Sequence, residues 1–256
     1  MSVLAVIPAR YASTRFPGKP LALLGGRSII SRVWQTVSSM PRVDEAIVAT
    51  DDERIYRHIN EVAGYEAAMM TSTEHHSGTD RCGEVLQRLE QLGEHYDVVV
   101  NVQGDEPFVT EQQINTLIDS FRDRFVEIAT LRTPITSREE LFSPNNVNVV
   151  CNKLDRALYF SRQPIPYRRG VAEEAWASTG EYYKHVGIYA FRDEALKTVC
   201  RLAPTALEES EKLEQLRWLY DGFQIAVKTT DHANIGIDTP EDLAEAERLL
   251  GEKQPR

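Results

Sequence analysis

The chain has 256 residues, 42% of them hydrophobic and 27% charged, which is ordinary for a globular protein with a proper core. Its net charge of −10, from 29 Lys plus Arg against 39 Asp plus Glu, argues against broad binding to nucleic acid or anionic membranes. No apolar run approaches the roughly 20 residues of a membrane span, and the opening segment lacks the features of a secretory signal. The three cysteines are odd in number and widely spaced, which favours a reducing cytoplasm over a disulfide framework or a zinc site.

Short apolar runs alternate with helical patterns in the first half of the chain. The runs at 3–7, 45–50 and 96–102 are β-branched and nearly continuous, as expected of strands buried on both faces. Apolar residues at helical spacing predict helices at 28–39, 52–63, 81–92 and 112–121. This alternation predicts a mostly parallel sheet with helices on both faces.

The second half is less regular. It predicts strands at 126–131, 147–150, 157–161, 185–191 and 223–228, with helices at 207–220 and from Pro240 onward. No repeat or linker is evident. We therefore expect one α/β domain over residues 1–256, with an irregular insertion at roughly 130–205. Ligands of such sheets bind at the carboxyl ends of strands, so functional motifs should follow strands.

The loop P-A-R-Y-A-S-T-R-F-P-G-K-P follows the first strand and carries Arg10, Arg15 and Lys19. It fits neither the phosphate loop G-x-x-x-x-G-K-[ST] nor the dinucleotide fingerprint G-x-G-x-x-G. A solvated basic turn is one interpretation. Against it, three neighbouring cations repel one another, and a bound triphosphate would relieve that repulsion.

Two carboxylates, Asp105 and Asp238, follow predicted strands. Asp105 lies in N-V-Q-G-D-E-P, where an ordinary turn and a Mg²⁺ ligand are equally consistent with the pattern. Asp238 lies in I-G-I-D-T-P-E-D-L, where Thr239 already serves as a helix cap. This favours a metal or phosphate role for Asp238, although capping by Asp238 itself is the alternative.

Two further stretches carry weaker signals. In H-H-S-G-T-D-R, residues Ser77, Gly78 and Arg81 suit the edge of a base or a phosphate, and helix capping is the plain alternative. In K-H-V-G-I-Y, alternation places His185 and Tyr189 on one face, which fits a solvent-facing strand as well as a substrate pocket.

Together these stretches resemble the 3-deoxy-manno-octulosonate cytidylyltransferases, or CMP-Kdo synthetases, from Val3 to about Leu250. The matching motifs are I-P-A-R-Y-A-S-T-R-F-P-G-K-P-L, V-A-T-D, H-S-G-T-D-R, N-V-Q-G-D-E-P, A-L-Y-F-S-R-x-x-I-P, K-H-V-G-I-Y, L-E-Q-L-R and I-D-T-P-E-D-L. The resemblance implies a nucleotide-diphospho-sugar transferase fold, a homodimer built partly by the insertion, and Mg²⁺ dependence. The implied reaction is CTP plus Kdo to CMP-Kdo plus pyrophosphate, a step in lipopolysaccharide assembly.

The resemblance also implies roles for individual residues. It assigns the CTP phosphates to Arg10, Arg15 and Lys19, and cytosine to Ser77, Gly78 and Arg81. It assigns Mg²⁺ to Asp105 and Asp238, which with Lys19 form the catalytic set. The residues that it assigns to the Kdo pocket are Gln103, Arg162, His185, Tyr189, Glu214 and Gln215.

Other interpretations stay open at this stage. The acceptor could be an 8-amino analogue of Kdo or a sialic acid, and a non-catalytic nucleotide-sugar sensor would keep the fold while losing Lys19 or a metal carboxylate. A glycosyltransferase would use an acidic run, but Asp51-Asp52-Glu53 is also a plausible helix start. Phe16 and the segment 171–181 depart from the commoner family pattern, which leaves the dimer geometry least determined.

Overall fold

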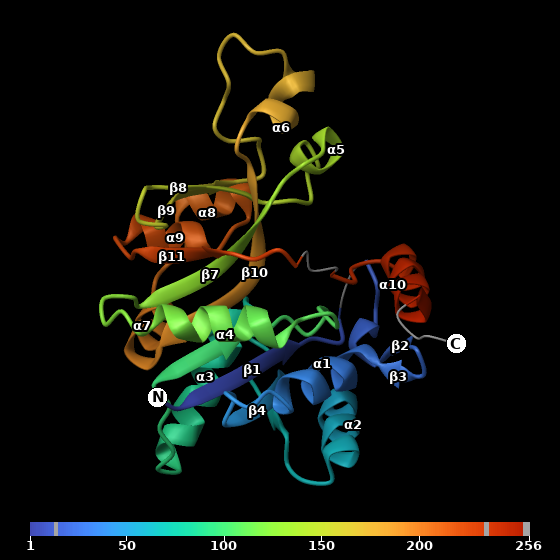
Figure 1. The fold of residues 1–256 in the computed structure, drawn as a ribbon. Helices are drawn as coiled ribbons and strands as arrows, with labels where there is room; N and C mark the ends of the chain where they lie inside the picture. The colour runs from blue at the N-terminus through green and yellow to red at the C-terminus, as the bar shows by residue number, and fades with distance from the viewer. Residues whose placement is uncertain (13–14, 233–235, 253–256) are drawn as a thin grey trace. The chain divides into compact units, whose positions relative to one another are not determined.

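The computed structural model describes residues 1–12, 15–232 and 236–252 (Figure 1). The chain forms two compact units, one made of Met1–Gln112 with Asn234–Arg256 and the other of Gln113–Ala233. The expected insertion at 130–205 lies wholly inside the second unit. Within the described residues, no helix has the length and apolar character needed to cross a membrane.

The first unit contains four parallel strands in the order β6-β1-β4-β5. They are β1 (Val3–Ala9), β4 (Glu45–Thr50), β5 (Ala68–Met70) and β6 (Val98–Asn101). Strands β1, β4 and β6 are buried almost throughout, as their continuous apolar runs predict. The short strand β5 has no such run and was not predicted.

The first unit's helices follow the predicted pattern closely. They are α1 (Ile29–Ser38), α2 (Glu53–Ala63), α3 (Gly78–Gln91) and α10 (Pro240–Glu252). The chain moves from β1 outward through α1 and α2 to β5, then returns through α3 to β6 on the other side of β1. Because such crossovers are right-handed, α1 and α2 cover one face of the sheet and α3 the other. The reversal beside β1 places a topological switch point at the carboxyl end of that strand.

A short hairpin in the first unit supports the C-terminal helix. Strands β2 (Leu23–Leu24) and β3 (Arg27–Ser28) pair antiparallel, and Figure 1 shows α10 beside them. The shared core of this region is formed by Leu24, Ile29, Ile237 and Ala246.

The second unit begins within α4 (Glu111–Ser120) and contains a mixed set of strands. Strand β7 (Ile128–Pro134) pairs antiparallel with β10 (Tyr183–Arg192) and parallel with β11 (Ile225–Thr229). Strands β8 (Asn148–Cys151) and β9 (Ala157–Ser161) pair antiparallel. The other helices are α5 (Arg138–Leu141), α6 (Trp176–Thr179), α7 (Asp193–Val199), α8 (Ala206–Glu211) and α9 (Gln215–Tyr220), with a 3₁₀ turn at Glu173–Ala175.

The single helix predicted at 207–220 is wrong, because the structure divides it into α8 and α9. Lys212 ends α8 in the left-handed conformation, with a φ of 54°. The carbonyl of Glu211 accepts a 2.8 Å bond from Nε of Arg162 instead of continuing the helical ladder. This long-range partner explains the break, which periodicity alone did not indicate.

Candidate active site

A cavity of about 350 Å³ lies in the first unit, at the carboxyl ends of β1 and β6. Its volume falls within the roughly 300–1,000 Å³ of small-molecule sites. The side chains that line it include Arg10, Arg15, Lys19, Gly78, Arg81, Gln103, Asp105 and Asp238. The structure therefore brings the cationic loop, both predicted metal ligands and two of the three predicted base-recognition residues to one place.

A turn at Gly18 fixes the described residues just before Lys19. Gly18 has a φ of 74°, which favours glycine, and its N–H donates to the carbonyl of Tyr11 at 3.0 Å. This turn starts the short 3₁₀ helix Lys19–Leu21 and so directs Lys19. The guanidinium of Arg54 stacks 3.3 Å from the Tyr11 ring centroid, a support that sequence reasoning missed because it joins distant segments.

Lys19 joins the two carboxylates. Its Nζ lies 2.5 Å from Oδ2 of Asp105 and 3.0 Å from Oδ1 of Asp238. Arg15 donates to the other oxygen of Asp238 at 3.0 Å. Burial alone would lower the pKa of Lys19, but the charges and hydrogen bonds of Asp105 and Asp238 outweigh it and raise the pKa. Lys19 therefore stays charged at neutral pH.

Asp105 is positioned by a close approach of the loop after β6 to the end of strand β1. Gly104 precedes it, and a Cβ at Gly104 would lie 2.7 Å from the carbonyl oxygen of Pro8. Only glycine lets the loop after β6 reach this backbone without displacement. The carbonyl of Asp105 also accepts a 3.0 Å bond from the N–H of Ile237, which ties the two carboxylate-bearing segments together.

Asp238 is positioned by the start of α10. The N–H groups of Asp238 and Thr239 both donate to Oδ2 of Asp242 at 2.9 Å, and Thr239 accepts from the N–H of Asp242 at 3.2 Å. Thr239 is thus the cap that the sequence predicts, and the Asp238 side chain is left to contact Lys19 and Arg15.

The described residues of the cavity differ in how fully their side chains are already paired. Arg81 is 1% exposed and donates to Asp51 at 2.6 Å and to Thr71 at 2.6 Å. Its Nε is buried with no hydrogen-bond partner in the described part of the chain.

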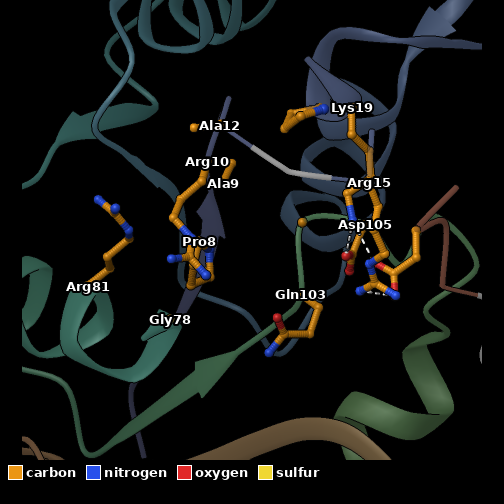
Figure 2. Close-up of a pocket in the computed structure, with 13 residues that line it drawn as sticks. Pro8, Ala9, Arg10, Ala12, Arg15, Lys19, Gly78, Arg81, Gln103 and Asp105 are labelled. Carbon is orange, nitrogen blue, oxygen red and sulfur yellow. Dashed lines mark hydrogen bonds and ion pairs between the residues drawn. The ribbon is translucent and has the colours of Figure 1, made fainter. Parts of the chain in front are cut away.

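Arg10 is exposed, and Figure 2 shows it with Arg81 on one side of the cavity, apart from Lys19, Arg15 and Asp105.

The start of α3 is capped by the residues before it. The Ser77 hydroxyl accepts a 3.1 Å bond from the N–H of Asp80, and the Asp80 carboxylate accepts a 3.1 Å bond from the N–H of Ser77, which completes a capping box. Gly78 follows the cap and packs against Pro8. Capping, the alternative interpretation for this stretch, is therefore present, and Gly78 also lines the cavity. His75 contacts Glu84 at 2.5 Å.

The acidic run Asp51-Asp52-Glu53 also has structural partners. Asp52 caps α2 by accepting from the N–H of Arg54 at 3.0 Å, and the partly exposed Asp51 pairs with the buried Arg81. These contacts account for both aspartates and agree with a helix start.

His185 and Tyr189, predicted to share a face, lie together in the second unit with ring centroids 5.2 Å apart. Nε2 of His185 lies 2.9 Å from Oγ1 of Thr130, which also lies 2.8 Å from the carbonyl oxygen of Ile188. Burial lowers the pKa of His185 to about 3. Burial and the nearby Glu214 raise the pKa of Tyr189, so its hydroxyl stays protonated.

The remaining predicted Kdo residues of the second unit lie near the break between α8 and α9. Arg162 donates to the backbone at Glu211, Glu214 lies 3.3 Å from Arg217, and Gln215 is buried at the start of α9. Trp218 packs edge-on against Tyr189 with centroids 5.0 Å apart, and its indole N–H is buried without an acceptor among the described residues. Sequence reasoning did not single out Trp218.

The donor set of the first unit fits a divalent cation only in part. No group of three or more His, Cys, Asp or Glu side chains that could hold a metal occurs among the described residues. Mg²⁺, however, is commonly held by one or two carboxylates together with substrate phosphates. Asp105 and Asp238 converge on one point beside the loop cations, which fits that mode.

Comparisons with known proteins agree on one family. A family model described as cytidylyltransferase matches residues 4–229. A 3-deoxy-manno-octulosonate cytidylyltransferase of Bacteroides thetaiotaomicron is 49% identical over 253 residues, covering 98% of both chains. One of Thermodesulfovibrio yellowstonii is 44% identical over 253 residues, again covering 98% of both. A solved structure of CMP:2-keto-3-deoxy-manno-octonic acid synthetase complexed with CTP superposes with a TM-score of 0.89 at 38% identity, covering 99% of this chain and 100% of that one.

Proposed function

Because the chain belongs to the cytidylyltransferase family, we propose that it transfers the cytidylyl group of CTP to Kdo, giving CMP-Kdo and pyrophosphate for lipopolysaccharide synthesis. The observation that carries this proposal is the convergence of Lys19, Asp105 and Asp238 in a cavity that also contains Arg10 and Arg15. A nucleotide bound in this cavity would therefore meet both the cations that suit its triphosphate and the carboxylate oxygens that suit its metal ion.

The two ends of the cavity suit the two ends of the nucleotide. Arg15 and Lys19 would hold phosphates at one end, and Arg10, which lies on the same side as Arg81, would hold phosphate from the other side of the cavity, with Arg offering forked donors and Lys a compact charge. At the other end, Gly78 allows close approach and Arg81 has a buried, unpaired Nε that a cytosine oxygen could satisfy. Ser77 is the weakest member of this set, because its hydroxyl already caps α3.

Asp105 and Asp238 would hold Mg²⁺, which when bound would neutralise phosphate charge and lower the pKa of the attacking hydroxyl. The loop residues would orient the triphosphate so that the anomeric hydroxyl of Kdo meets the α-phosphorus in line. The new phosphorus–oxygen bond would form as the bond to pyrophosphate breaks, and the hydroxyl proton would pass to solvent water. Lys19 and Arg15 would offset the charge that collects on the departing pyrophosphate.

The residues proposed to contact the acid sugar are considered for each unit by itself: Gln103 in the first unit, and Arg162, His185, Tyr189, Glu214 and Gln215 in the second. The properties of the aromatic pair support this. A neutral His185 has one ring nitrogen that accepts and one that donates, and a protonated Tyr189 hydroxyl can donate, so the pair suits sugar hydroxyls.

A homodimer and a cytoplasmic location complete the proposal. Large exposed side chains in the second unit, Leu154, Leu158 and Tyr167 at 68%, 60% and 74% exposure, support an association surface there. Light scattering on the purified protein tests the dimer, and a monomer at micromolar concentration would contradict it. The use of CTP and the isolated cysteines support the cytoplasm.

The proposed activity is tested by pyrophosphate release in the presence of Mg²⁺. The substrates are CTP or UTP, each paired with Kdo, 8-amino-Kdo or sialic acid. We expect release with CTP and Kdo, and much less with UTP. Release only with 8-amino-Kdo or sialic acid would identify that sugar, rather than Kdo, as the acceptor. Release with none of the sugars would favour the non-catalytic sensor interpretation.

A further inference from the structure

One ammonium group occupies the point on which the two carboxylates converge. Lys19 Nζ lies within 3.0 Å of both Asp105 and Asp238, and only 11% of the Lys19 side chain is exposed. We propose that Lys19 acts as a stand-in cation in the nucleotide-free protein, holding the two carboxylates in place and excluding a divalent cation until nucleotide binds. This inference rests on the proposed function, because it takes Asp105 and Asp238 as the metal ligands.

The positive charges around this point oppose the binding of a free divalent cation. The Lys19 ammonium lies within hydrogen-bond distance of both carboxylates, so a divalent cation between the same carboxylates would meet its positive charge at short range in a partly buried site. Arg15 adds a second cation on the other oxygen of Asp238. Both carboxylates are thus already neutralised, and the gain from binding a free metal ion is small.

Nucleotide changes this balance because it brings new partners for Lys19. Phosphate oxygens in the cavity would accept the ammonium's hydrogen bonds and leave the carboxylate oxygens free. The movement needed is confined to the side chain. The backbone of the 3₁₀ turn is held separately, by a 2.9 Å bond from Leu21 N–H to Gly18 and a 3.0 Å bond from Ala22 N–H to Lys19. Metal and nucleotide therefore bind together, and neither carboxylate is ever left unpaired.

The test is direct binding of Mn²⁺ to the nucleotide-free protein, followed by electron paramagnetic resonance. We expect Lys19→Gln to bind Mn²⁺ about tenfold more tightly than the wild type, because the competing charge is removed. Lys19→Arg keeps the charge and should bind as weakly as the wild type. Arg10→Gln is the matched control: it removes a cation from the same loop and cavity, but Arg10 contacts neither carboxylate, so binding should change less than about twofold.

Two double variants separate this inference from the proposed function. Adding Asp105→Asn or Asp238→Asn to Lys19→Gln should abolish the gain in Mn²⁺ affinity. If Lys19→Gln shows no gain while the single aspartate variants still lose pyrophosphate release, the stand-in role is wrong and the proposed function stands. If the gain persists in the double variants, the metal binds elsewhere, and both the stand-in role and the ligand assignment are wrong. Thermal unfolding of each variant checks that it is folded, so that an unchanged Mn²⁺ affinity cannot be attributed to loss of the fold.

Discussion

Gly104→Ala offers a sharp test of how the site is assembled, because it adds one methyl group and no charge. The new Cβ would lie 2.7 Å from the carbonyl oxygen of Pro8 and 3.1 Å from Cδ1 of Ile30. Carbon–oxygen contacts normally start at about 3.3 Å, so the loop after β6 must move away from the end of β1 by roughly 0.6 Å. The backbone at Gly104 does not require glycine for its φ, so this steric effect is isolated.

Two consequences follow for Gly104→Ala. Overpacking of this kind costs about 2 kcal/mol, which lowers the unfolding midpoint by roughly 4–8 °C in a protein of this size. Displacement of the loop after β6 also lengthens the 2.5 Å contact between Lys19 and Asp105. We therefore expect the turnover in pyrophosphate release to fall at least about tenfold.

Calorimetry and pyrophosphate release measure the two effects of Gly104→Ala. Gly251→Ala is the control, since Gly251 is exposed and a Cβ there meets nothing within 4 Å. A Gly104→Ala protein with the midpoint and turnover of the wild type would refute the claim that this close approach positions Asp105.

Three further substitutions probe the supports of the site. Asp242→Ala removes two hydrogen bonds to the backbone at Asp238, so we expect a loss of about 1 kcal/mol in urea unfolding and a lower turnover; unchanged turnover would show that this cap does not position the carboxylate. Asp51→Asn leaves the buried Arg81 charge unpaired and should destabilise the protein by about 3 kcal/mol, whereas an effect below about 1 kcal/mol would mean that the pair is effectively solvated. The pKa of His185 is lowered from 6.5 to about 3, so as the pH falls the unfolded chain takes up a proton before the folded protein does. Between about pH 8 and pH 5 the wild type should therefore lose about 2 kcal/mol more unfolding free energy than His185→Gln. If the unfolding free energies of the two proteins changed in parallel with pH, the lowered pKa of His185 would be contradicted.

Local patterns predicted most of the secondary structure, because they depend on neighbouring residues. The strand at 45–50 and the helix from Pro240 were predicted at their observed positions, the first from a buried β-branched run and the second from a Thr-Pro-Glu-Asp start. The short strands β2, β3 and β5 lack a periodic signal. The break at Lys212 depends on Arg162, far away in the chain, and no local pattern contains that information.

The site was predicted in its composition but not in its pairing. That Arg10, Arg15, Lys19 and Asp105 meet follows from the rule that motifs after parallel strands share one edge. Asp238 instead lies just before α10 and is tied to the Asp105 segment by the bond from Ile237 N–H to the Asp105 carbonyl. That Lys19 bonds both carboxylates could not be predicted, because it depends on how three segments far apart in sequence are placed within a few tenths of an ångström. The engagement of Arg81 by Asp51 is hidden for the same reason.

The central claim is that Asp105 and Asp238, with the loop cations, form one nucleotidyl-transfer site. Its most direct test is Mg²⁺-dependent pyrophosphate release from CTP and Kdo by the wild type, Asp105→Asn and Asp238→Asn, with folding checked by circular dichroism. We expect each variant to stay folded and to lose at least about 100-fold in turnover, because each carboxylate acts on the charge that develops in the transition state. Near-normal release from either folded variant would contradict the claim.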